Sequence, residues 1–332
     1  MKGRSAAVLL LAALIISPAA ALMAGRFPLS AHEVLSALYP PLFSEPAPQM
    51  VTNIVLNIRL PRVLLAMLAG AGLGVAGGAF QALFSNPLAT PDTLGVATGA
   101  SFGAALGILL GLPSAGVQLC ALASGLLAVA IVLFVSRIRG SSSVIMMILA
   151  GMVTSALFSA LVSLVKFAAD PQDVLPAVTF WLMGSLSGTT RESLLFGSPL
   201  IIAGTAVIWF YRWRLNAMTL SDDEAQSLGV DVKKTRFFVV VAAAAITASV
   251  VSMCGLIGWV GLLIPHASRM LFGNDNRRVI PSSIVLGALF MLAIDTAARS
   301  ATASEIPSSI LTAMIGAPFF IFLLRRTGGI KA

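Results

Sequence analysis

Runs of apolar residues, separated by short segments rich in charge, proline or glycine, repeat along the whole of this chain. An α-helix needs roughly 20 apolar residues to cross the hydrocarbon core of a bilayer, and ten of the runs are close to that length. The pattern therefore predicts an all-α, polytopic membrane protein, a single transmembrane domain over residues 1–332 with an outer loop at 26–58. The predicted spans are residues 5–25, 60–84, 93–111, 115–136, 143–167, 192–211, 237–254, 257–272, 281–298 and 307–324.

The composition excludes the main classes of soluble protein. Hydrophobic residues make up 58% of the chain, charged residues 10%, and the mean hydropathy is +0.97, so there is too little charge to cover a soluble domain of this length. The net charge of +8 does not indicate nucleic-acid binding, because the basic residues lie at the ends of the apolar runs. Cys120 and Cys254 are expected to be small buried side chains, and with only His32 and His266 no metal cluster can be assembled.

Lys and Arg are divided unevenly between the two sets of helix ends, with fifteen on the side of the N-terminus and six on the other side. Because cytoplasmic ends carry the excess of positive charge, both termini are predicted to be cytoplasmic. The first run has a second interpretation, since Lys2, Arg4, the apolar stretch and Ala19–Ala21 also fit a signal peptide. The length of the run favours a retained first helix.

The segment from Arg212 to Arg236 is a polar island that the same charge count places in the cytoplasm. It holds nine of the 21 basic and 13 acidic residues of the chain within 25 positions. A membrane protein that concentrates charge in one loop is expected to present that loop to a partner in the water. The chain has no G-x-x-x-x-G-K-[ST] motif, so if transport uses ATP, a partner must bind it.

Two features of the apolar runs indicate packing and turns. The stretch 72–77 matches the dinucleotide motif G-x-G-x-x-G, but it lies within an apolar run without a preceding strand. Glycines spaced by four, at 70, 74 and 78 and at 99, 103, 107 and 111, predict close helix packing instead. Asn86-Pro-Leu-Ala-Thr-Pro91 cannot continue a helix and predicts a structured turn.

Three polar features at the ends of the runs each have two interpretations. Arg59 and Arg62, at an outer helix end, fit either an anchor to lipid headgroups or a docking site for an acidic partner. Asp295 and Arg299, spaced i,i+4, fit either a structural ion pair or part of a proton relay. Ser141–Ser143 fit either a helix cap or a constriction lined by small side chains.

Several of these segments together resemble the permease subunits of type II ABC importers, the FecCD-like family that carries ferric siderophores, haem and cobalamin. The resemblance is collinear over nearly the whole chain. It rests on the Arg59-Leu-Pro-Arg62 block and on residues spread over both halves of the chain: Gln81, Asn86, Pro87, Pro91, Gly258, Pro265, His266, Asp295, Glu305 and Pro307.

The resemblance implies a transport permease and not an enzyme, in the inner or plasma membrane of a bacterium or archaeon. It implies a second copy of the chain, or a paralogous permease, across a central path. It also implies two cytoplasmic ABC ATPases and a periplasmic substrate-binding protein. The chain itself would hold no cofactor, and ATP with Mg²⁺ would bind to the ATPase. The implied cargo is a ferric siderophore, with haem, cobalamin and oxyanions such as molybdate as alternatives.

The resemblance also assigns roles to particular residues. Two short helices in the polar island would couple to the ATPase, through Leu215, Asn216, Ala217, Leu220, Ser221, Asp222, Glu224, Ala225, Leu228 and Gly229. Arg59, Arg62 and Arg299 would dock the binding protein, and Ser142, Ser143 and Val144 would form the cytoplasmic gate. Relatives often have glycine at the bend between the two short helices, where this chain has Ser221. Serine there predicts an N-cap for the second helix.

Two other functions remain as alternatives. A secondary transporter driven by an ion gradient would need carboxylates within its spans, and this chain offers little beyond Asp295. An intramembrane enzyme would need paired acids or a His/Asp/Glu cluster, which the sequence does not supply.

Overall fold

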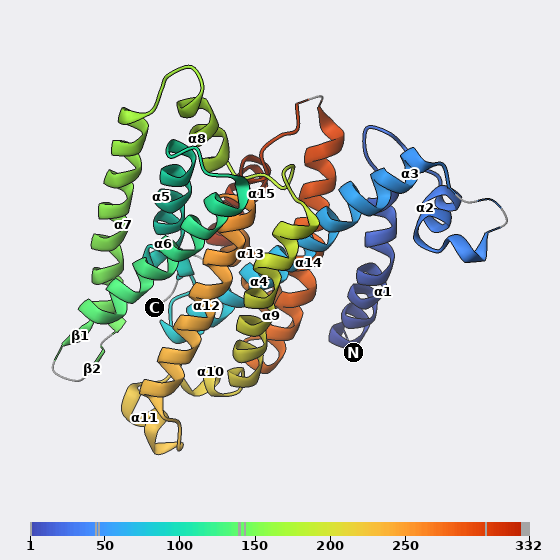
Figure 1. Cartoon of the computed structure of the whole chain (residues 1–332). Helices are drawn as coiled ribbons and strands as arrows, with labels where there is room; N and C mark the ends of the chain where they lie inside the picture. Colours follow the sequence, from blue (N-terminus) through green and yellow to red (C-terminus); the bar gives the residue numbers. More distant parts are fainter. Residues whose placement is uncertain are drawn as a thin grey trace.

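The computed structural model describes residues 2–43, 45, 47–138, 141–142, 144–302 and 304–326. Each predicted apolar run corresponds to one helix (Figure 1). Seven of the helices are long and apolar enough to cross a membrane, and α5, α13 and α15 are shorter apolar helices. The predicted all-α, polytopic fold is therefore confirmed. The helices are α1 Lys2–Met23, α4 Leu60–Leu83, α5 Val96–Leu109, α6 Ser114–Val135, α7 Val144–Ala168, α9 Arg191–Tyr211, α12 Val232–Cys254, α13 Val260–Phe272, α14 Asn276–Ala301 and α15 Ser308–Arg326.

Short elements connect these helices. The segment before α4 folds as α2 Ala31–Leu38, a 3₁₀ turn η1 Pro40–Leu42, α3 Gln49–Asn53 and a π-helical turn η2 Ile54–Arg59 that runs directly into α4. The remaining short elements are the 3₁₀ turn η3 Pro91–Leu94, α8 Val174–Leu182, α10 Arg214–Ala217, α11 Asp222–Ser227, and the antiparallel pair β1 Arg137–Ile138 and β2 Ser141–Ser142. The sequence pattern did not predict α8, because its nine residues are far too few for a span.

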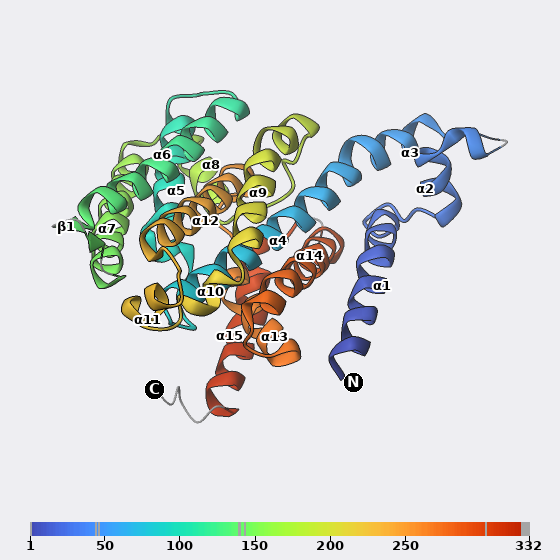
Figure 2. The ribbon, with the colours of Figure 1, turned by 90° about the horizontal axis from the view of Figure 1, so that it is seen from below.

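Helix α4 lies at the centre of the molecule, and α9, α12, α13 and α14 pack around it (Figures 1 and 2). A second group, α5, α6 and α7, packs against α12 on one side, and α1 packs on α14 at the opposite edge. The N-terminal end of α1 and the α10–α11 loop lie at the same end of the molecule (Figure 1). This arrangement fits the predicted topology, although the side of the membrane on which that end lies remains a prediction.

The glycines of α4 bring neighbouring backbones into contact. A Cβ atom added at Gly70 would lie 2.0 Å from the carbonyl oxygen of Gly287 in α14, and one added at Gly77 would lie 1.9 Å from that of Gly261 in α13. In α5, a Cβ at Gly103 would lie 2.1 Å from a carbonyl oxygen of α6. The prediction that these glycines pack helices is confirmed, except at Gly111, which ends its helix with φ +67° and has no neighbour within 4 Å.

The polar island, residues 212–236, is largely helical. Helix α12 begins at Val232, five residues before the predicted span, because the Asp231 side chain accepts a hydrogen bond from the Lys234 N–H and caps the helix. The island therefore consists of α10, α11 and the first turn of α12.

We predict that Gly77→Ala destabilises the protein, because the added methyl group would overlap the Gly261 carbonyl and force α4 away from α13. Overpacking of this kind costs about 1–3 kcal/mol. Gly78→Ala is the matched control, since its Cβ would make ordinary contacts of 3.4–3.6 Å. Thermal denaturation in detergent, followed by size-exclusion chromatography, compares the two variants. Equal melting temperatures would contradict the assigned glycine contact.

Candidate functional site

The α10–α11 loop is held at its bend by a reciprocal pair of hydrogen bonds. The Ser221 hydroxyl accepts from the Glu224 N–H (3.4 Å), and the Ser221 N–H donates to the Glu224 carboxylate (3.0 Å). Asp222, Asp223 and Glu224 occupy the first turn of α11, where negative charge stabilises a helix. Ser221 has φ −63°, a conformation that any residue adopts. The predicted serine cap is therefore confirmed, and the bend does not require glycine.

One side of this loop is buried and the other is exposed. Leu215, Met218 and Ala225 belong to the main hydrophobic core, with at most 4% of their surface exposed. Leu220 and Leu228 are 47% and 64% exposed. The loop is thus fixed on the helix bundle by one apolar face and presents two leucines outward.

Charged side chains attach α11 to α12. Arg236 donates to both carboxylate oxygens of Asp222, at 2.8 and 3.3 Å, in a bidentate geometry that is among the stronger ion pairs. The backbone N–H and the side chain of Lys234 hold the pKa of Asp231 below its ordinary value. This carboxylate is therefore charged at neutral pH, where it caps α12.

Asn216 attaches α10 to the start of α14. Its side-chain amide donates to Asp275 (2.7 Å) and accepts from the Asn276 N–H (2.8 Å). The bond from Asn216 first, and then a hydrogen bond from the Arg277 N–H, hold the pKa of Asp275 below its ordinary value. The Ser85 hydroxyl adds a bond of 3.3 Å to the Thr219 carbonyl, which ties the end of α4 to the same loop.

A polar hollow of about 540 Å³ lies beneath this attachment. The Asn86–Pro91 turn forms part of its wall. Within that turn the Asn86 side chain accepts from the Leu88 N–H (2.9 Å), so the segment is the structured turn that its prolines predict. The hollow is lined by Gln81, Ala82, Ser85, Asn86, Pro87, Asn216, Thr219, His266, Arg269, Asn274 and Asn276.

Three buried arginines lie at the opposite end of the bundle. Arg59, Arg62 and Arg299 are 5–6% exposed. Arg62 donates to Asp295 and to Glu305, each at 2.8 Å, while Arg299 lies 3.6 Å from the second oxygen of Asp295. The predicted i,i+4 pair is present, but the shorter partner of Asp295 is Arg62, which is 233 residues away in sequence. The spacing could not predict this contact.

Arg59 and Arg299 bind the C-terminal end of α1. Arg59 donates to the carbonyls of Leu22 (2.6 Å), Met23 (3.2 Å) and Phe27, and Arg299 donates to that of Ala21. The last carbonyls of a helix have no partner within it and carry partial negative charge. All three guanidinium groups are therefore bound within the chain and are not presented at the surface. Their docking role stays a prediction, and it would require them to exchange these partners.

The structure covers the predicted gate only in part. Val144 is the first residue of α7 and packs, half-buried, against the main core. The backbone of Ser142 pairs with Arg137 in the β1–β2 hairpin, whereas Ser143 lies outside the described residues. The gate assignment therefore remains a prediction.

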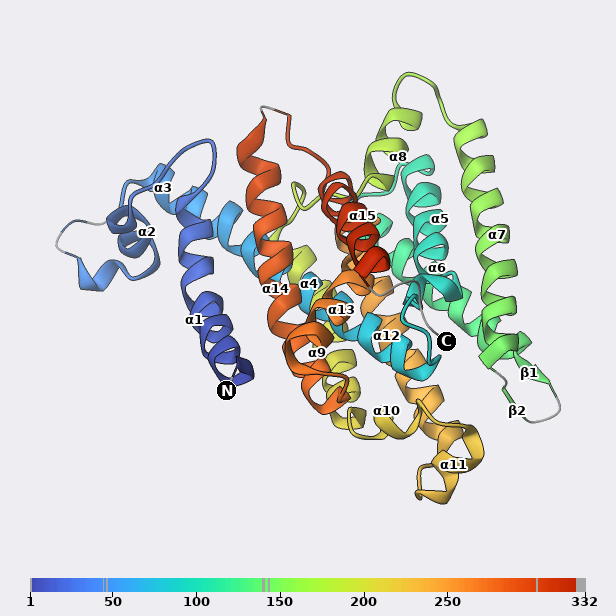
Figure 3. The ribbon, with the colours of Figure 1, turned by 180° about the vertical axis from the view of Figure 1, so that it is seen from behind.

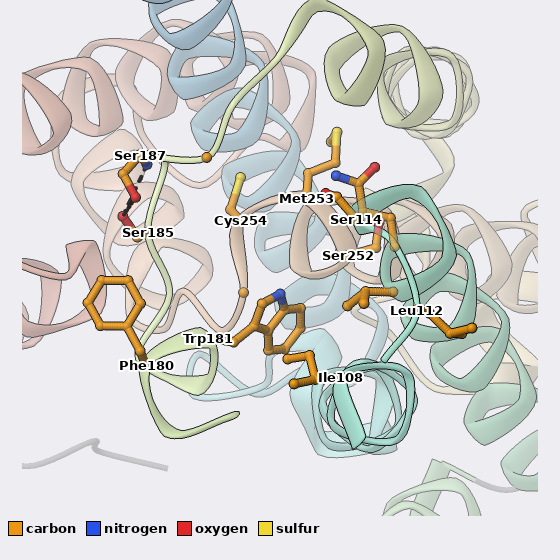
Figure 4. Close-up of a pocket in the computed structure, with 14 residues that line it drawn as sticks. Ile108, Leu112, Ser114, Phe180, Trp181, Ser185, Ser187, Ser252, Met253 and Cys254 are labelled. Atoms are coloured by element: carbon orange, nitrogen blue, oxygen red, sulfur yellow. Dashed lines mark hydrogen bonds between the residues drawn. The ribbon is translucent and has the colours of Figure 1, made fainter. Parts of the chain in front are cut away.

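A second hollow, of about 290 Å³, lies near the other end of the bundle (Figure 4). Ser114 and Gln118 of α6, Trp181 of α8, the serines of the 185–187 segment and the end of α12 around Cys254 line it. The Cys254 carbonyl accepts from the Ser185 N–H at 2.7 Å. Cys254 is a buried free thiol, as predicted, whereas the free thiol Cys120 is only half-buried.

Comparisons with known proteins agree with this architecture. The model of the FecCD transport family matches residues 9–326. A molybdate import system permease protein of Haemophilus influenzae is 38% identical over 318 residues, 95% of this chain and 94% of that protein. A "probable iron chelatin transport system permease protein" of Helicobacter pylori is 39% identical over 277 residues, 83% of this chain and 84% of that protein. A solved structure described as an inward-facing conformation of a metal-chelate type ABC transporter superposes with a TM-score of 0.86 and 37% identity, covering 96% of this chain and 97% of that one.

We predict that Arg62→Ala strongly destabilises the protein. The substitution leaves the fully buried Asp295 carboxylate with only the longer Arg299 contact, and breaking a buried pair costs about 3–5 kcal/mol. Asp295→Asn in the same chain should recover part of the lost melting temperature, because it removes the uncompensated charge. A double variant no more stable than Arg62→Ala would contradict the assigned pairing.

The reciprocal hydrogen bonds between Ser221 and Glu224 predict that the stability of α11 depends on pH. Hydrogen bonds from Ser221 lower the pKa of Glu224 below its ordinary value of 4.5, so they stabilise α11 above that value. The stabilisation is lost as the pH falls through the lowered pKa. The protection factors of the α11 amides against hydrogen exchange, corrected for the intrinsic pH dependence, should therefore fall on acidification below about pH 4.5. Glu224→Gln should reduce this dependence, and an unchanged dependence in that variant would assign it to another group.

Proposed function

This chain belongs to the FecCD transport family of ABC importer permeases, and we propose that it moves a metal chelate, a ferric siderophore first of all, from a periplasmic binding protein into the cytoplasm. The observation that carries this proposal is the α10–α11 loop. Its apolar inner face is fixed to the core while Leu220 and Leu228 are exposed at one end of the bundle.

We propose that a cytoplasmic ATPase binds this loop. Two exposed leucines on a well-ordered, charged loop can form the apolar centre of a contact with a partner, surrounded by polar residues. The acidic first turn of α11 and the Arg236–Asp222 pair hold the loop in one shape before binding, and preorganisation of this kind reduces the entropy lost on association. ATP and Mg²⁺ would be bound by the ATPase and not by this chain.

A second copy of the chain, or a paralogous permease, is the proposed partner within the membrane. Helices α7 and α15 lie at the periphery of the bundle in the view from below (Figure 2). They expose large apolar side chains, among them Met152, Val153, Met314 and Ile315. An apolar face of this kind fits either lipid or another permease. We assign part of it to the permease, so that the translocation path lies between the two copies.

The periplasmic binding protein is proposed to dock at the end of the bundle opposite the coupling loop. Arg59, Arg62 and Arg299 can take part only if acidic groups of the binding protein replace Asp295, Glu305 or the carbonyls of α1 as their partners. Because of this requirement, a charge reversal at these arginines cannot test docking alone. Reversing the charge of Arg62 would disrupt the fold as well as docking, because it would place a third carboxylate beside Asp295 and Glu305.

Molybdate is a second candidate cargo. The Haemophilus influenzae permease named for molybdate import matches 95% of this chain, more than the 83% matched by the permease named for iron chelatin. Haem and cobalamin remain family alternatives. A secondary transporter is disfavoured, because both oxygens of the buried Asp295 face arginines and the carboxylate is not open to an ion path.

We predict that Leu220→Asp and Leu228→Asp abolish association with the ATPase without unfolding the permease. Each places a charge where an apolar contact with the ATPase is proposed. Leu42→Asp is the control, because Leu42 is 79% exposed in the segment that precedes α4 and is far from the loop. Co-purification of the ATPase, with ATP hydrolysis in vesicles, measures the effect. Full association of both loop variants would overturn the proposal.

The cargo is tested through the cognate binding protein. Mass spectrometry of the purified binding protein should show a bound ferric siderophore, and vesicles with the full complex should take it up in the presence of ATP. Recovery of molybdate instead would replace the siderophore by the second candidate. Uptake that continues with a hydrolysis-deficient ATPase would favour the secondary transporter.

A further inference from the structure

The two short helices of the coupling loop are attached to different parts of the bundle. Helix α11 is held to α12 by the Arg236–Asp222 pair. Helix α10 is held to the start of α14 by Asn216, which bonds both the Asp275 carboxylate and the Asn276 N–H. A displacement of α10 would therefore act directly, through Asn216, on the corner between α13 and α14.

Helix α13 contains a proline that would weaken it in its first half, before the corner with α14. Pro265 has no N–H, so the carbonyl of Gly261, four residues earlier, lacks its helical donor. The side chain of Gln81 in α4 supplies a donor instead, with Nε2 at 3.3 Å from the Gly261 oxygen and 3.4 Å from that of Leu262. Gln81 is buried, with 3% of its surface exposed.

The other atom of the same amide binds α13 beyond the proline. Oε1 of Gln81 accepts a hydrogen bond from the Arg269 guanidinium. One side chain therefore bridges α13 across Pro265, from the carbonyls before the proline to the arginine after it. The Gly77–Gly261 contact brings the two backbones together at the same place. The hydroxyl of Ser268 donates to the Val279 carbonyl at 3.2 Å, which joins α13 to α14.

The far end of α13 contacts α15. Trp259, at the start of α13, has φ +71°, and its ring lies against Gly316. A Cβ added at Gly316 would be 2.8–2.9 Å from three ring atoms. Helix α15 lies beside α13 when the molecule is seen from behind (Figure 3). The path from the coupling loop to α15 is therefore continuous through α14 and a braced α13.

We propose that Asn216 and Gln81 are positioning residues that transmit the displacement of α10, through α13, to α15. This inference rests on the proposed function, in which α10 binds an ATPase and α15 borders the translocation path. Through the bonds of Asn216, the corner between α13 and α14 would move together with α10. Gln81 and Arg269 would keep α13 from bending at Pro265, so that the movement reaches Trp259.

The Asn216 contact is tested by exchanging its partners. Asn216→Asp removes the hydrogen-bond donor and places a second carboxylate beside that of Asp275. Substrate uptake per ATP hydrolysed should therefore fall about fivefold or more, which is the lower range of typical coupling effects. Asp275→Asn added to it restores a complementary pair, because the new amide can donate to the new carboxylate, and uptake per ATP should recover. Asn274→Asp is the control. It adds the same charge next to Asp275, and within the described part of the chain the Asn274 side chain has no hydrogen bond to lose, so this variant should couple normally.

The Gln81 bridge is tested by Gln81→Leu, which roughly keeps the volume but removes all three hydrogen bonds of the side chain. We expect the same loss of uptake per ATP, with the ATPase still bound. If Asn216 and Gln81 act in one path, the double variant should be little worse than either single variant, since effects within one network are not additive. Fully additive losses would overturn the shared path.

The complex of unmodified permease, ATPase and binding protein separates this inference from the proposed function. If that complex takes up no substrate, the proposed function fails. If it transports and Asn216→Asp couples as well as Asn274→Asp, only the inference fails. If Asn216→Asp does not assemble with its partners, the double variant Asn216→Asp with Asp275→Asn is decisive. Transport by that variant supports the contact, whereas the same assembly defect overturns it.

Discussion

In a bilayer the lipid tails are as apolar as the helices, so helices associate through close packing and internal hydrogen bonds and not through the hydrophobic effect. The contacts of α4 with α14 at Gly70–Gly287 and with α13 at Gly77–Gly261 meet that requirement. At these two contacts the backbone of α4 touches those of α14 and α13, which fixes the separations of the three helices. Both the Gln81 bridge over Pro265 and the Arg62–Asp295 pair depend on those separations, because side chains from α4 reach their partners only at this distance.

The polar groups at the two ends of the bundle are organised differently. At the α10–α11 end, side chains bond backbone groups and carboxylates near water, and two leucines remain exposed. At the opposite end, three guanidinium groups are buried and bound by two carboxylates and the last carbonyls of α1. The α10–α11 end thus presents apolar side chains on an ordered loop, whereas the three arginines could meet a partner only by exchanging internal contacts.

Much of this fold could be predicted from the sequence, because hydrophobic runs and glycine spacing are local signals. The ten helices, the packing role of Gly70 and Gly77, and the Ser221 cap all follow from residues within a few positions of each other. The partners of Arg62, Gln81 and Asn216 are 59 to 243 residues away, and no periodicity reveals which distant side chains meet. Family resemblance identified several of these residues without their contacts. It suggested surface roles for arginines that the fold buries.

The arginine contacts with α1 have a consequence for how the protein is made. Arg299 bonds the Ala21 carbonyl across 278 residues of sequence. At about 5–20 residues per second, the ribosome needs roughly 14–56 s to make that stretch. During this interval Arg59 is the only one of the two arginines that can bind the C-terminal end of α1. The Arg299 bond and the packing of α1 on α14 can therefore form only after nearly the whole chain has been synthesised.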